Sequence, residues 1–194
     1  MHIRLVLITA FALTLFPLTG LCYGAPFITL EGCGESVFLT AEEIGEGKDA
    51  VMEAAMPDPV MFILRRGSPN GINLTAVYGD AGENILGTLP PAMKGFDDYG
   101  ELEEGFALQC AVRDLNGDGK PEVLVATGDG AALLTVVVFV YTPGGNERFR
   151  AAAVIEGQST LHVDVNGVIS VPYGSQGLFT EYTVSADGEV TKKE

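Results

Sequence analysis

The stretch RDLNGDGKPEVLVA, Arg113 to Ala126, gathers oxygen-bearing side chains around a tight turn and then continues as an apolar run. The oxygens come from positions 1, 3, 5 and 9 of a D-x-N-G-D-G-x-x-E pattern: Asp114, Asn116, Asp118 and Glu122. Side chains at alternating positions of a tightly wound loop turn towards one point, and Gly117 and Gly119 allow the backbone conformations that this winding needs. Carboxylates that converge in this way repel each other unless a cation lies between them. The segment therefore predicts a loop that wraps a metal ion.

Calcium is the metal ion that these groups suit best. Ca²⁺ is a hard cation that takes about six to eight oxygen ligands. The loop offers carboxylates, an amide oxygen and a backbone carbonyl, so we expect five ligands: Asp114, Asn116, Asp118, Lys120 and Glu122. An EF-hand is excluded, because its bidentate Glu would fall at Val125 and because a strand rather than a helix follows. A solvated Asn-Gly-Asp-Gly turn between two strands stays open as the alternative to a calcium site.

The loop and its flanking strands resemble a known repeat family. VRDLNGDGKPEVLVAT matches almost throughout the signature of the FG-GAP/VCBS repeat, the calcium-binding blade unit of integrin-type β-propellers and many secreted bacterial proteins. ALLTVVVFVYTPGGNERF looks like the remaining strands of such a blade, so the resemblance covers about residues 106–155. It implies that Lys120 binds calcium through its carbonyl and that the other four ligands bind through their side chains. The family usually has Asp where Glu122 stands, and here the chain departs from the pattern.

The signature occurs clearly once. HVDVNGVIS and VSADGEV keep only part of the pattern, and we interpret both as plain hairpin turns. A closed β-propeller needs at least about four blades of four strands, which this chain is barely long enough to supply. An open or compact meander with one blade-like unit is therefore the expectation.

Strand signals dominate the chain after Pro59. PVMFILRRG and INLTAVYGD flank SPNG, a good hairpin turn, and about nine or ten such strands follow one another through short connections. ALLTVVVFVYT is apolar on both faces, which predicts a central strand covered on both sides. Residues 86–105 are interpreted as a long acidic loop rich in Pro and Gly. Together these signals predict an all-β fold, an antiparallel meander with a propeller-blade-like unit and one short N-terminal helix.

Helical signals are confined to residues 31–57. Thr40 and Glu43 have the spacing of a capping box, and the run KDAVMEAAM ends at Pro57, as a helix should. The pattern predicts a short helix over Asp49–Met56 and leaves open an extra turn before it.

The N-terminus is typical of a secretory signal. Arg4 precedes an uncharged apolar run and small residues follow, which predicts a signal peptide over residues 1–24 and a single β-rich domain over residues 25–194. A lipoprotein anchor at Cys22 and a retained N-terminal anchor are the alternatives. We therefore expect a secreted or periplasmic protein with no membrane span in the mature chain. The formal net charge of −15 disfavours nucleic acid and anionic lipid as partners.

Cys33 and Cys110 are the two cysteines that remain after residue 24. In a compartment that permits disulfides they would close a long loop and stabilise the fold. We expect this disulfide, with two buried free thiols as the alternative.

Motifs for catalysis are scarce. His162 is the only histidine after residue 24 and lies in an apolar strand pattern, which is typical of a structural residue. YGSQG is not a nucleophile elbow, because Tyr173 stands where a glycine is needed. The acidic residues between Asp97 and Glu104 are interpreted as a solvated loop rather than a glycosidase pair.

The sequence thus favours a secreted or periplasmic calcium-binding β domain that acts as a structural or binding module, with an unknown protein or polysaccharide as its partner. A carboxylate-dependent hydrolase is the second hypothesis. A periplasmic inhibitor or accessory protein, with residues 86–105 inserted into its partner, is the third.

Overall fold

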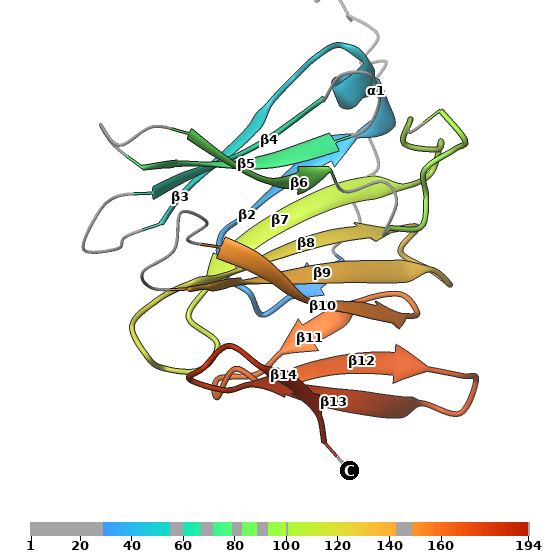
Figure 1. The fold of residues 1–194 in the computed structure, drawn as a ribbon. Helices are drawn as coiled ribbons and strands as arrows, with labels where there is room; N and C mark the ends of the chain where they lie inside the picture. The colour runs from blue at the N-terminus through green and yellow to red at the C-terminus, as the bar shows by residue number, and fades with distance from the viewer. Residues whose placement is uncertain are drawn as a thin grey trace, which may run out of the picture.

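The structure is a computed structural model that describes residues 29–54, 60–66, 72–78, 83–88, 93–99, 101–142 and 149–193. The expected signal peptide, residues 1–24, lies outside the described residues. Within them the chain forms fourteen strands and one short helix, arranged in three sheets (Figure 1). No helix in this part of the chain is long and apolar enough to cross a membrane.

Each sheet is built around four strands that follow one another in the chain. The first sheet contains β3 (Ala50–Ala54), β4 (Val60–Arg66), β5 (Ile72–Tyr78) and β6 (Glu83–Thr88). The central sheet contains β7 (Ala107–Arg113), β8 (Glu122–Gly128), β9 (Leu134–Tyr141) and β10 (Phe149–Gly157). The third contains β11 (Leu161–Val163), β12 (Ile169–Tyr173), β13 (Leu178–Val184) and β14 (Val190–Lys192). Consecutive strands within each sheet pair antiparallel, so the predicted all-β antiparallel fold is confirmed.

Two N-terminal strands extend the later sheets. β2 (Ser36–Thr40) pairs antiparallel with β7, and β1 (Leu30–Glu31) pairs with β11 in the only parallel pairing among the described strands. Gln109 holds this start of the chain in place, because its buried Oε1 accepts hydrogen bonds from the Thr29 N–H (2.9 Å), the Thr29 hydroxyl (2.6 Å) and the Leu30 N–H (2.8 Å). The start of the described chain is thereby tied to two sheets.

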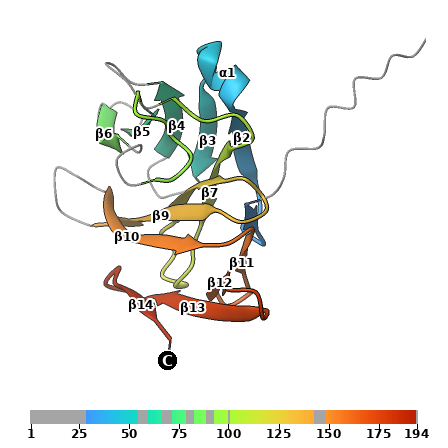
Figure 2. The same cartoon turned by 90° about the vertical axis from the view of Figure 1, so that its right-hand side faces the viewer.

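The three sheets are stacked as layers, with the central sheet between the other two (Figures 1 and 2). Every residue of β8 is buried, and all of β9 except Tyr141 is buried, because neighbouring sheets cover both faces. Alternate residues of β9 therefore pack into different cores: Val137 and Phe139 into the one shared with β3 and β4, Val136 and Val138 into the one shared with β11 and β12. The expectation that ALLTVVVFVYT forms a central, doubly covered strand is confirmed.

The helix is present but not where the chain predicts its main body. The capping box of Thr40 and Glu43 forms and begins the helix α1 (Ala41–Gly45). The prediction of a helix over Asp49–Met56 is wrong, because residues 50–54 form β3. Ala50 and Met52 are buried while Val51 is exposed, an alternation that suits a strand beside β4 better than a helix.

The expected disulfide does not form in the described structure. Cys33 and Cys110 are free thiols, 3% and 1% exposed. Cys110 packs into the core between the first and central sheets, whereas Cys33 packs into the core between the central and third sheets. The central sheet separates the two sulfur atoms, and the two thiols stay buried apart.

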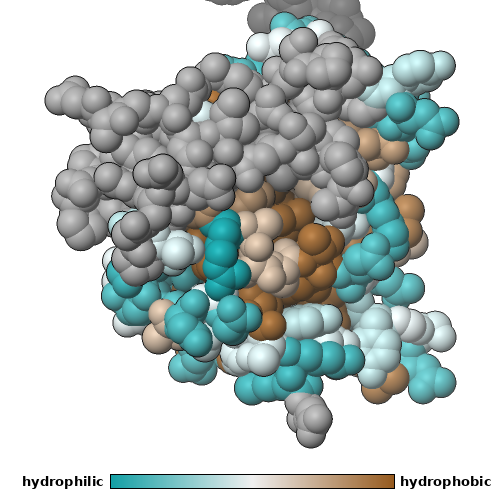
Figure 3. Space-filling view, in the orientation of Figure 1, coloured by the Kyte–Doolittle hydropathy of each residue, from teal (hydrophilic) through white to brown (hydrophobic). Residues whose placement is uncertain are grey.

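The sheet edges differ in their protection. β10 forms one edge of the central sheet and carries a bulge between Ala151 and Ala153, which interrupts the regular backbone of an edge. Figure 3 shows an apolar area across the middle of this face, where β10 lies in Figure 1, and Val154, a residue of β10, is 49% exposed.

The SPNG turn between β4 and β5 falls outside the described residues, although the two strands pair as that turn predicts.

Candidate metal centre

The candidate loop connects β7 to β8 in the central sheet. Arg113 and Glu122 lie opposite each other where the two strands pair, so the hairpin holds both ends of the loop. Gly117 and Gly119 have φ angles of +74° and +81°, a backbone region that glycine enters without strain. The glycines therefore supply the tight winding that their spacing predicts.

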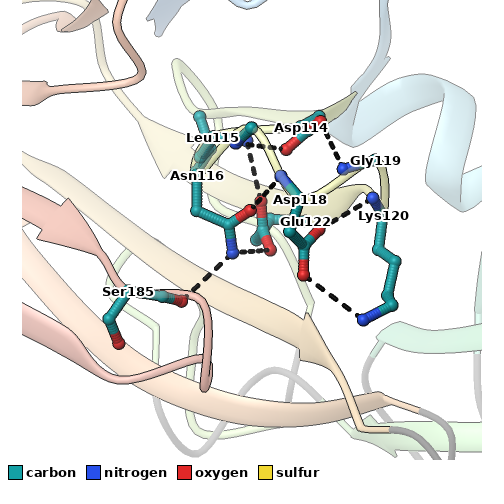
Figure 4. A network of polar contacts seen from close by, with 9 residues as sticks. Asp114, Leu115, Asn116, Asp118, Gly119, Lys120, Glu122 and Ser185 are labelled. Atoms are coloured by element: carbon teal, nitrogen blue, oxygen red, sulfur yellow. Dashed lines mark hydrogen bonds and ion pairs between the residues drawn. The ribbon is translucent and has the colours of Figure 1, made fainter.

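Side-chain oxygens of the loop accept hydrogen bonds from the loop's own backbone N–H groups (Figure 4). The two carboxylate oxygens of Asp114 accept hydrogen bonds from the N–H groups of Gly117 (2.7 Å) and Gly119 (2.9 Å). The Oδ1 atom of Asn116 accepts one from the N–H of Asp118 at 2.9 Å. Each of these oxygens keeps a further lone pair, so the same atoms can also face a cation.

Lys120 brings the one positive charge of the loop. Its N–H donates to Asp118 Oδ1 (2.8 Å), and its Nζ lies 3.4 Å from Asp118 Oδ2. The same Nζ lies 5.7 Å from the centre of the Tyr141 ring, within cation–π range. Because the Lys120 side chain is 39% exposed, water screens much of its attraction for the loop carboxylates.

Glu122 is the most deeply buried member of the set, at 2% exposed. Its Oε2 accepts a hydrogen bond from the Leu115 N–H at 2.8 Å, and its Oε1 lies 3.4 Å from Asn116 Nδ2. Burial, reinforced by the negative charges of Asp118 and Asp114, raises the pKa of Glu122 to about 7. Glu122 is therefore the residue of the set whose charge most needs a neighbouring cation.

The loop also contacts the third sheet. Asn116 Nδ2 donates to the carbonyl of Ser185, in the turn between β13 and β14, at 3.1 Å (Figure 4). Gly167, in the turn between β11 and β12, approaches so closely that a Cβ there would lie 1.8 Å from the Leu115 carbonyl oxygen. The conformation of the loop and the position of the third sheet are thus coupled.

Arg113 strengthens the same contact from the end of β7. Its guanidinium donates to the carbonyl of Gly32 and to the carbonyl of Asp164 in the third layer. Its charge is directed at these carbonyls.

The five predicted residues lie on the β7–β8 loop and at the start of β8, and their chemistry fits a hard cation. The donors are carboxylates, an amide oxygen and one backbone carbonyl, with no thiolate or imidazole among them. No three His, Cys, Asp or Glu side chains of the described residues are grouped closely enough to hold a metal ion as they stand. The oxygens would have to draw closer around an ion, and their hydrogen bonds to the loop amides already hold them on this loop.

Other candidate residues have structural surroundings. His162 is a surface residue whose side chain is 51% exposed and whose Nδ1 lies 3.9 Å from Glu31. Asp97 accepts hydrogen bonds from the N–H groups of Tyr99 and Glu101, both at 2.9 Å, and so shapes a turn in the acidic loop. Asp164 does the same for Asn166 and Val168 in the β11–β12 turn, which has the geometry of a plain hairpin turn.

Comparisons of the chain with models of protein families, with curated proteins and with solved structures gave no match. The resemblance to the FG-GAP/VCBS repeat therefore stays a prediction from the loop residues. Sequence reasoning missed the contact between Asn116 and Ser185, because the two residues stand 69 positions apart. It also missed the depth at which Glu122 is buried.

Proposed function

We propose that this protein is a secreted or periplasmic calcium-binding β domain that serves as a structural or binding module, with calcium held by the β7–β8 loop. The observation that carries the proposal is the burial of Glu122 at the start of β8, directly after the loop that carries Asp114 and Asp118. A carboxylate withdrawn from water beside two others is stable only when it is protonated or when a cation compensates it. The exposed Lys120 ammonium offsets only part of the negative charge of Asp118.

Bound calcium would supply a fixed double positive charge at the centre of the loop. Side-chain oxygens of Asp114, Asn116 and Asp118 would hold it together with the Lys120 carbonyl, and Glu122 would hold it from the start of β8. Their likeness to the FG-GAP/VCBS pattern supports this assignment. The hydrogen bonds that the loop already forms would keep these oxygens close to their binding positions, so little ordering would accompany binding.

Thermal unfolding in excess EDTA, in about 2 mM CaCl₂ and in about 2 mM MgCl₂ tests the proposal. A site with a Kd of about 10⁻⁴ M would stabilise the fold by roughly 2 kcal/mol at this calcium concentration, and the Tm would rise by roughly 4–8 °C. Magnesium should have a smaller effect, because it prefers a rigid octahedral shell and keeps its waters.

Two matched variants identify the site. Asp118→Asn removes one loop carboxylate charge and should abolish most of the calcium response. Asp164→Asn makes the same change in the β11–β12 turn, where the aspartate also accepts backbone N–H groups, and should leave the response intact. A wild-type Tm that is equal in calcium and EDTA would mean that the loop is a solvated turn.

The hydrolase hypothesis needs a carboxyl group with a raised pKa that lines a cleft. Glu122 has the raised pKa, but it is buried and lines neither of the two cavities that flank the loop. The described structure thus gives the binding module the stronger support.

A further inference from the structure

A groove of about 550 Å³ lies between the first and central sheets, next to the β7–β8 loop. Its described lining comes from the start of β2, from β3, and from the end of β7 with the following loop: residues 35–37, 51–53, 112–114, 119 and 121. Unlike the buried cores, this groove is open to solvent. It therefore offers space for a segment of another molecule.

The walls of the groove are two sheet edges. β2 is the last strand of the central sheet and pairs only with β7, and β3 is the last strand of the first sheet and pairs only with β4, as far as the described residues extend. The helix α1 connects the two strands, which places their edges on the same side of the molecule (Figure 2). An edge strand presents unpaired backbone N–H and C=O groups, which an extended peptide can pair with as an added strand.

The side chains around these edges carry a net negative charge. Glu35, Glu53 and Asp114 line the groove, and neither Glu35 nor Glu53 forms an ion pair with a described residue. Arg113 is the one basic residue of the described lining, and its guanidinium donates to carbonyls of the β1–β2 connection and the third sheet. A basic occupant is complementary to this lining, whereas a second copy of a chain with a net charge of −15 is not.

We propose that this groove binds an extended basic segment of a partner protein, which adds as a strand to the edge of β2 and places Lys or Arg side chains against Glu35 and Glu53. Val51, which shares a strand face with Glu53, would contact the aliphatic stems of the basic side chains, and Val37 lines the same groove. The inference names a partner class for the binding module, yet it does not require calcium, because Glu35 and Glu53 lie outside the β7–β8 loop.

The test uses a fluorescein-labelled heptapeptide, Lys-Val-Lys-Thr-Lys-Val-Lys, and fluorescence anisotropy in EDTA at about 50 mM NaCl, where charge pairs are weakly screened. The double variant Glu35→Gln/Glu53→Gln should bind it about five- to tenfold more weakly than the unaltered protein, as expected for two exposed charge pairs. Glu42→Gln/Glu103→Gln makes the same change in net charge away from the groove and should stay within about twofold. Melting curves of both double variants establish that each is folded.

A second peptide separates strand addition from simple charge attraction. N-methylation of alternate residues keeps every Lys charge but removes the backbone donors on one edge of the peptide, so binding should fall at least about tenfold. Slower hydrogen exchange of the β2 amides in the presence of the unmodified peptide would support the assigned edge.

Equal binding of the unmodified peptide by the two double variants would overturn the proposal, and so would equal binding of the methylated and unmodified peptides. The titration is repeated in about 2 mM CaCl₂, a concentration at which a weak extracellular-type site would be largely occupied. Peptide binding without any calcium-dependent rise in Tm would leave the groove assigned and the metal site rejected. A calcium-dependent rise in Tm without peptide binding would leave the metal site assigned and the groove proposal rejected.

Discussion

Glu122 sets the pH dependence that we expect for the metal-free protein. Its pKa is about 7 in the fold and 4.5 in the reference state, so the unfolded chain releases this proton at lower pH than the folded chain does. The free energy of unfolding should therefore fall as pH rises from about 4.5 to 7, by about 3 kcal/mol in total. Urea unfolding in EDTA across this pH range, for the unaltered protein and for Glu122→Gln, measures this decrease. The variant should lack it.

Without metal at pH 7.5, Glu122→Gln should be the more stable of the two proteins, and with calcium the unaltered protein should be the more stable. A bound cation stabilises the ionised Glu122, so at pH 7.5 the unaltered protein should gain stability from calcium while Glu122→Gln gains little. If the two proteins show parallel pH profiles in EDTA, Glu122 is solvated in solution and its burial cannot carry the metal site.

Gln109 is the residue on which the position of β1 depends. Leucine in its place would leave three buried donors without an acceptor, at a cost of about 3 kcal/mol or more. Gln109→Leu should lower the urea midpoint accordingly and accelerate hydrogen exchange at Leu30. Ser36→Ala, which removes only the acceptor of the Gln109 side-chain N–H, should cost about 1 kcal/mol. Equal effects of the two variants would contradict this assignment.

At the scale of elements, the contact between the β11–β12 turn and the metal loop can be tested with two glycines. Gly167 and Gly174 both have positive φ angles, +77° and +66°, so alanine is strained by a similar amount at either position. Only at Gly167 would the added Cβ also meet the backbone of Leu115, whereas nothing lies within 4 Å at Gly174. Gly174→Ala should cost about 1 kcal/mol of unfolding free energy, and Gly167→Ala at least about 3 kcal/mol.

Calcium titrations of the same two variants complete the comparison. Gly167→Ala should also weaken calcium binding, because the turn can return to a relaxed position only by displacing the loop. Gly174→Ala should leave calcium affinity unchanged. Similar stability and affinity in both variants would show that the turn and the loop are not coupled.

Local patterns predicted many of the elements, but they missed β2 and β6, which runs into residues 86–88 of the predicted acidic loop, and they failed at β3. Alternation and turn residues predicted the strands on both sides of SPNG and PGGNE, and the spacing of Thr40 and Glu43 predicted where a helix begins. AVMEA suits either a helix or a strand in isolation, and it becomes β3 because β4 offers it a partner. Tertiary pairing decided that case, and no five-residue window contains such information.

At the scale of the whole molecule, the stacking of the sheets decides the chemistry of the cysteines. Burial raises the pKa of Cys33 to about 11 and that of Cys110 to about 12, so both thiols should react slowly in the native protein. Thiol titration with a chromogenic disulfide should find two reactive groups per domain after unfolding in urea, with or without prior reduction. The disulfide would exist if reduction changed the Tm. It would also exist if the mass of the unreduced protein were lower by two hydrogen atoms than that of the reduced protein.

The layers also explain what the chain alone does not reveal. The spacing of the loop oxygens predicted the five site residues, since all of them lie within nine positions. The burial of Glu122 and the separation of the cysteines depend instead on which face of the central sheet each strand residue adopts and on what covers that face. Those relations join residues that are distant in the chain, and local periodicity carries no information about them.

The pairing of β1 with β11 has a consequence for the order of events during synthesis. Leu30 leaves the ribosome about 130 residues ahead of its partner Leu161, an interval of roughly ten seconds at ordinary translation rates. Throughout that interval the third layer does not exist, and one face of the central sheet has nothing to cover it. The first strand of the described chain is thus among the last to be fixed, and a nascent chain exposes apolar surface to chaperones until residues 161–192 have emerged.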